Sequence, residues 1–146
     1  MLRRSTLATT RGMRALAIAN AAGAALSMAS AVVGLLSPEL ALPGAAEHAG
    51  PLTELYVQAY VVRALPLGAA LLRQLLVSRT GRGLVPLLLV AGAVQAGDAA
   101  IGLVAHNPGM TAGGAVLAVL HLGLAARLAR TADHPTAGRT ADPASA

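Results

Sequence analysis

The chain lacks cysteine, phenylalanine and tryptophan, and it is poor in charged residues. Only 12% of its 146 residues are charged, whereas a water-soluble domain normally carries about 25%. Without cysteine there is no disulfide framework, no thiolate nucleophile and no metal site with cysteine ligands. Without Phe and Trp, a soluble core would lack its usual large fillers. This composition argues against an ordinary soluble domain.

Sequence patterns for chemistry are also missing. The chain has no Gly-rich phosphate loop, HExxH motif or nucleophile elbow. His48, His106 and His134 lie outside the apolar runs at no recognisable ligand spacing. All eleven basic residues are Arg, but nearly all of them flank apolar runs, and no aromatic platform for stacking bases accompanies them. We therefore expect no enzyme activity, no cofactor, no metal and no nucleic-acid partner.

Apolar residues are abundant and occur in long runs. They make up 55% of the chain, and its mean hydropathy is +0.65. A transmembrane helix needs about 20 mostly apolar residues. Four runs qualify: residues 15–36, 55–77, 83–105 and 111–128. We predict an all-α integral membrane four-helix bundle over residues 15–130, after an Arg-rich N-terminal segment (1–14) and before a disordered polar tail (131–146).

The connections between the runs differ in charge. Residues 37–53 form a predicted loop with Pro and Gly, residues 79–82 a tight connection, and residues 106–109 a turn. Arg residues precede the first run, occupy the second connection and follow the last run, whereas the first and third connections contain none. Positive residues in short loops are retained in the cytoplasm. We therefore expect a cell-membrane protein with both termini in the cytoplasm.

A cleaved secretory signal peptide is the alternative for the first run. Arg residues precede the apolar stretch, and Ala29-Ser30-Ala31 resembles a small-residue cleavage site. The apolar run continues to Leu36, however, and so exceeds the roughly 7 to 15 residues of a signal h-region. A transmembrane span is the favoured interpretation.

Three ionisable residues stand out deep inside the predicted spans: Arg63, Asp98 and His121. Each costs about 2.5 to 3.5 kcal/mol at a helix centre on insertion scales. Counted at 1.5 Å per residue, they lie roughly 12, 10 and 15 Å below the external boundary, and so in one layer. We predict an ion pair between Arg63 and Asp98, with His121 or Gln95 completing its hydrogen bonds. This polar cluster either organises the bundle or forms a site for a proton, an anion or a small amphipathic ligand.

The second span has two further features near Arg63. Tyr56, Tyr60 and Arg63 follow an i, i+4, i+7 pattern, which predicts that they share one helical face. Tyr60 either lines an external vestibule with the cluster or anchors the helix at the headgroups, whereas Tyr56 is better suited to anchoring. Pro66 removes the N–H that would bond the carbonyl of Val62, and this favours a kink.

The first span has no charge but carries a seam of small and polar residues, which we interpret as a packing surface without chemistry. Its members are Asn20, Gly23, Ser27, Ser30 and Gly34. Thin, Ala-rich helices enclose little volume and leave such seams available for partners. We therefore also expect a homo-oligomer.

Three segments carry a resemblance to a known family. They are "VVRALPLGAALLRQLL" with Arg63, "GDAAIGLVAHNPG" with Asp98 and "AVLHLGLAARL" with His121. Over residues 51–128 the chain resembles the small four-helix bacterial membrane proteins called DoxX-like, especially a branch classed as a domain of unknown function. The resemblance implies a four-helix bundle and no established activity. Its name suggests one alternative, a membrane subunit of a quinone-linked redox system, and a small transporter is another.

Overall fold

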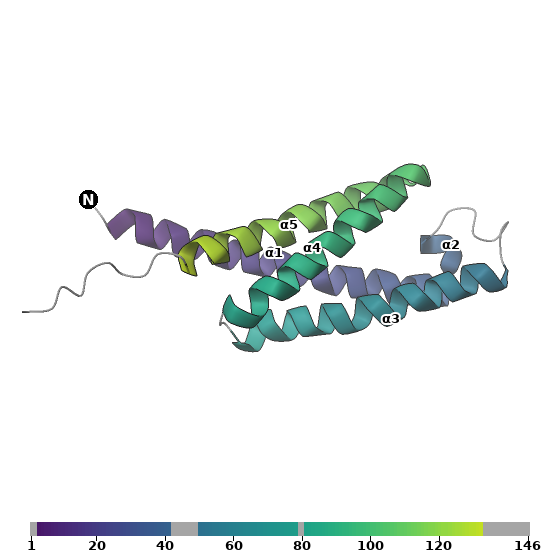
Figure 1. Ribbon diagram of the computed structural model, residues 1–146, viewed down its shortest axis with the longest axis horizontal. Helices are drawn as coiled ribbons and strands as arrows, with labels where there is room; N and C mark the ends of the chain where they lie inside the picture. Colours follow the sequence, from purple (N-terminus) through teal and green to yellow (C-terminus); the bar gives the residue numbers. More distant parts are fainter. Residues whose placement is uncertain (1–2, 42–49, 79–80, 133–146) are drawn as a thin grey trace, which may run out of the picture.

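The four predicted spans form helices in the computed structural model, which describes residues 3–41, 50–78 and 81–132. The helices are α1 (Arg3–Leu36), the short α2 (Pro38–Ala41), α3 (Pro51–Arg73), α4 (Gly81–Val104) and α5 (Pro108–Ala132), and a π-helical turn, η1 (Gln74–Ser78), follows α3. The described residues contain no strand. The fold is an all-α four-helix bundle (Figure 1).

The four long helices are arranged as two antiparallel pairs. α4 packs against α5 along most of its length, α1 packs mainly against α3, and the two pairs cross one another (Figure 1). α3 contacts α4 much less than it contacts α1. Because α1 also packs on α5, side chains from all four helices meet where the pairs cross.

The turn between α4 and α5 is closed by the side chain of Asn107. Its Oδ1 accepts a hydrogen bond from the Met110 N–H at 3.0 Å, which is the N-cap arrangement. Pro108 occupies the first helical position, where its missing N–H costs nothing. The predicted turn over residues 106–109 and the predicted start of the span at residue 111 are therefore corrected, because α5 already begins at Pro108.

Close approach of α4 and α5 depends on Gly114. A Cβ atom at this position would lie 2.7 Å from the backbone nitrogen of Ala99 and 2.8 Å from the carbonyl oxygen of Gln95. Both atoms belong to the backbone of α4, so no side-chain rotation would relieve the contact. The missing side chain thus allows the two helices to pack with their backbones in contact.

Several helix ends differ from the predicted spans. α1 begins at Arg3, so the described part of the Arg-rich segment continues the first helix, consistent with the good helix propensity of Arg. The predicted loop over residues 37–53 contains α2 and, from Pro51, the start of α3. α5 extends to Ala132. The remainder of the predicted tail, residues 79 and 80 of the tight connection, His48 and His134 lie outside the described residues.

The long helices present apolar side chains outward. Segments of all four are long and apolar enough to cross a membrane: Arg11–Leu36, Glu54–Val77, Gly83–Val104 and Pro108–Thr131. Large apolar side chains such as Leu36 and Val104 are 75% and 81% exposed, whereas Leu71, Leu88 and Leu124 form a small core. Such extensive apolar exposure suits lipid and not water. The chain is thus a multi-pass membrane protein.

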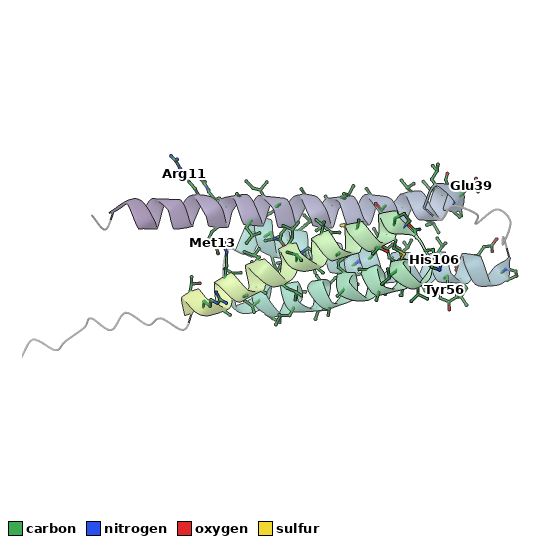
Figure 2. The ribbon with its side chains drawn as sticks, turned by 90° about the horizontal axis from the view of Figure 1, so that it is seen from above. Arg11, Met13, Glu39, Tyr56 and His106 are labelled. Carbon is green, nitrogen blue, oxygen red and sulfur yellow. The ribbon has the colours of Figure 1, made fainter. Side chains whose placement is uncertain are left out.

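Charged residues separate to the two ends of the bundle. Arg11 lies at one end, and Glu39 lies at the other, together with Tyr56 and His106 (Figure 2). Because α3 and α5 run antiparallel to α1, their final Arg residues lie at the end of Arg11 (Figure 1). The bundle therefore has one basic end, and an opposite end that carries Glu39 and Glu54.

Candidate functional site

Arg63 of α3 and Asp98 of α4 form an ion pair. One guanidinium nitrogen, Nη2, donates to Asp98 Oδ1 at 2.9 Å. Asp98 is buried, whereas the Arg63 side chain is 46% exposed and its guanidinium lies 5.3 Å from the centre of the Tyr60 ring. That separation allows a cation–π contact. The pair therefore joins a buried carboxylate to a guanidinium at the open side between α3 and α4.

A second polar contact joins α1 to α5. His121 Nδ1 lies 2.6 Å from Asn20 Oδ1, and both residues are buried. The Asn20 amide nitrogen donates to the carbonyl oxygens of Leu16, one turn earlier in α1, at 2.8 Å and of Leu120 in α5 at 3.1 Å. Both amide hydrogens and the amide oxygen of Asn20 thus have partners, as a buried polar group requires.

A third, longer contact joins α1 to α4. The Gln95 amide nitrogen donates to the hydroxyl oxygen of Ser27 at 3.4 Å. The predicted arrangement around the ion pair is therefore corrected in one respect. Among the described residues, His121 and Gln95 bond to α1 and not to Arg63 or Asp98. The physical reason is that α1 packs on α5, and this places Asn20 within reach of His121.

All four long helices line one small cavity, of about 30 Å³. Its polar lining includes the predicted residues: Tyr60 and Arg63 from α3, Gln95 and Asp98 from α4, and His121 from α5. Ser27 from α1 also lines it. A site of this volume and polarity has room for about one water molecule. Tyr56 is 76% exposed and lies near the acidic end, apart from this lining (Figure 2).

The seam of α1 has two kinds of members. Gly23 and Gly34 are buried, and a Cβ on Gly23 would meet the Leu117 side chain of α5 at 2.5 Å, so close packing is confirmed there. Ser30 is exposed. Asn20 and Ser27 also make hydrogen bonds, which the interpretation of the seam as packing alone missed. The sequence did contain an indication of these bonds. Burying an unpaired amide is costly, so an Asn such as Asn20 in an apolar span requires hydrogen-bond partners.

Pro66 lies one turn beyond Arg63 on α3. Its side chain is exposed, and α3 continues through it as one helix to Arg73. The ring therefore lies on the outer surface of the helix and does not line the cavity.

The described residues show no candidate metal centre. Within 3–41, 50–78 and 81–132, no group of three or more His, Cys, Asp or Glu side chains is placed to hold a metal ion. The polar cluster presents a carboxylate, an imidazole and a guanidinium to one small cavity.

Comparisons with known proteins add no relative. The chain matches no protein-family model, no curated protein and no solved structure. The resemblance to DoxX-like proteins therefore rests on the three quoted segments, and the contacts of the polar cluster carry the functional argument.

Proposed function

We propose that the chain is a non-enzymatic protein of the cell membrane whose polar cluster holds two helical pairs in register around a water-sized site for a proton or a very small ligand. One observation carries this proposal. The contacts Arg63–Asp98, Asn20–His121 and Ser27–Gln95 each connect a helix of the α1–α3 pair with a helix of the α4–α5 pair. All three therefore act at the interface between the pairs.

The physical setting makes these contacts important. In a bilayer, apolar side chains gain little by exchanging lipid for protein, so helix association depends on close packing and on polar contacts. Interhelical hydrogen bonds contribute about 0.6 kcal/mol on average and up to about 1.7 kcal/mol in membrane proteins. Their directionality also selects one rotation and one height for each helix. The cluster thus supplies the register that apolar packing alone leaves loose.

The charge distribution supports a specific orientation. The basic end carries Arg11, Arg14, Arg73, Arg127 and Arg130, and the opposite end carries Glu39 and Glu54. Under the positive-inside rule, the basic end lies in the cytoplasm together with both termini.

Cavity size favours a proton or water over larger ligands. About 30 Å³ is far below the roughly 300 to 1,000 Å³ of ordinary small-molecule pockets. A quinone-linked redox subunit and a small transporter, the two alternatives, each need a binding site of larger volume than this cavity. A bound quinone or amphipathic molecule found by mass spectrometry of the purified protein would favour them.

The proposal is tested by a double-mutant cycle on the ion pair. Arg63→Ala leaves a buried carboxylate unpaired, whereas Asp98→Ala leaves a half-exposed guanidinium unpaired. Loss of one partner of a fully buried pair costs about 3 to 5 kcal/mol, so we expect a loss near the lower limit for Arg63→Ala and a smaller loss for Asp98→Ala. The double variant should recover much of the loss. Thermal unfolding in mild detergent measures all three.

Matched controls remove a charge outside the cluster. Arg73→Ala and Glu54→Ala take away an exposed Arg and an exposed Glu at opposite ends of α3, and we expect changes within about 0.5 kcal/mol. Single-variant effects that simply add in the double variant would refute the proposal. If the charge-swapped protein, Arg63→Asp with Asp98→Arg, folds but loses a cellular phenotype that the control variants keep, the cluster is a working site and not only a structural one.

A further inference from the structure

The hydrogen bonds of Asn20 determine which nitrogen of His121 carries a proton. The amide nitrogen of Asn20 faces two carbonyl oxygens, those of Leu16 and Leu120. A flipped amide would place its oxygen against both carbonyl oxygens, which have no hydrogen to donate. Asn20 Oδ1 therefore faces His121 Nδ1, and because Oδ1 can only accept, Nδ1 must be the donor.

The remaining nitrogen follows from the same argument. A neutral imidazole has one protonated and one unprotonated nitrogen. With the proton on Nδ1, the lone pair of the neutral ring lies on Nε2. His121 lines the cavity, and within the described part of the chain its hydrogen bond is to Asn20. Nδ1 keeps its proton in either charge state, so proton uptake is confined to Nε2.

We propose that this cavity is a proton-binding site in which His121 Nε2 is the accepting atom and one water molecule is the route to it. This inference rests on the proposed function, since it requires the folded cluster. The step is a simple addition. A proton arriving through the cavity water binds the Nε2 lone pair, and no bond of the protein breaks.

The groups around the site allow it to carry this charge. α3 contributes Tyr60 and Arg63 to the lining, and α4 contributes Asp98 and the uncharged Gln95. α1 contributes only uncharged groups to the lining, Ser27 among them. With a neutral His121 ring, the ion pair leaves the cluster without net charge. A proton on Nε2 adds one positive charge to a lining that also holds the buried carboxylate of Asp98.

The test is ¹⁵N NMR of the full-length protein in lipid bilayers with labelled histidine. The His121→Gln variant identifies the His121 signals among those of the four histidines. At neutral pH we expect a protonated Nδ1 and an unprotonated Nε2. On acidification Nε2 should gain a proton while Nδ1 keeps its own. Asn20→Ala should release the tautomer so that Nε2–H appears, whereas Ser30→Ala, a control at an exposed position of the same helix, should leave the neutral spectrum unchanged.

Two results would overturn the inference. One is an Nε2–H tautomer of the wild-type ring at neutral pH. The other is an Nε2 that stays unprotonated about two pH units below the roughly 6.5 midpoint of ordinary histidine. Both results are read from the wild-type protein, once His121→Gln has identified the His121 signals. Either one would leave the double-mutant cycle of the ion pair intact, so failure of this inference is distinguishable from failure of the proposed function.

Discussion

Replacing Gly114 by Ala should separate the α4–α5 pair. The new Cβ atom would lie 2.7 Å and 2.8 Å from two backbone atoms of α4, whereas ordinary van der Waals contact begins at 3.4 Å. The helices must therefore move apart by about 0.7 Å at this point, since neither backbone atom can rotate away. Overpacking of this kind typically costs about 1 to 3 kcal/mol, and the rigid backbone places Gly114→Ala at the upper limit.

The adjacent glycine provides a matched control. A Cβ on Gly113 would meet nothing within 4 Å, and this residue is exposed. Gly113→Ala adds the same methyl group to the same turn of α5. Because Ala is favoured over Gly in a helix by up to about 1 kcal/mol, we expect this variant to be neutral or slightly more stable.

The assay is thermal or denaturant unfolding in mild detergent, followed by circular dichroism of the helices. A loss of about 3 kcal/mol corresponds to a change on the order of a hundredfold in the unfolding equilibrium constant. We expect that loss for Gly114→Ala and none for Gly113→Ala. Equal stability of the two variants would refute the conclusion that backbone contact at Gly114 sets the distance between α4 and α5.

Two further predictions concern topology and the Tyr60 contact. Reporters fused after Arg130 and at Gly81 should report the cytoplasm and one at Gly50 the outside, and a C-terminus found outside would contradict the proposed orientation. Tyr60→Phe should keep the ring that faces the Arg63 guanidinium and so its thermal stability, whereas Tyr60→Leu should lose about 0.5 to 1 kcal/mol. Equal effects of the two substitutions would show that the cation–π contact does not contribute to stability there.

The height of each polar residue along the bundle axis was predictable from the sequence. Run length alone located the four spans, and the fixed rise of the α-helix placed Arg63 and Asp98 in one layer. In the structure their side chains lie 2.9 Å apart. Counting along a helix gives a height, which lipid thickness and apolar composition constrain tightly.

The lateral neighbours were not predictable in the same way. Height says nothing about which helices are adjacent or how each is rotated, and those properties depend on close contacts such as Gly114 against α4 and Gly23 against Leu117. For this reason the sequence predicted that His121 bonds to the ion pair, whereas its partner in the structure is Asn20. The start of α5 was missed for a local reason, because the Asn107 cap depends on a side-chain rotamer that residue spacing does not reveal.

During synthesis of the protein, the first residue of each contact between the helical pairs is made before its partner and stays unpaired until the partner is translated. Asp98 follows Arg63 by 35 residues, so at about 5 to 20 residues per second Arg63 waits roughly 2 to 7 s for its partner to be translated. Asn20 precedes His121 by 101 residues and waits roughly 5 to 20 s.

The residue that stays unpaired for longer is thus Asn20, and its uncharged amide is less costly to hold near lipid than the guanidinium of Arg63. Arg63 also has a means of tolerating its shorter wait. Its long side chain can extend toward the headgroups until α4 has been inserted, so its charge need not be buried before Asp98 is available.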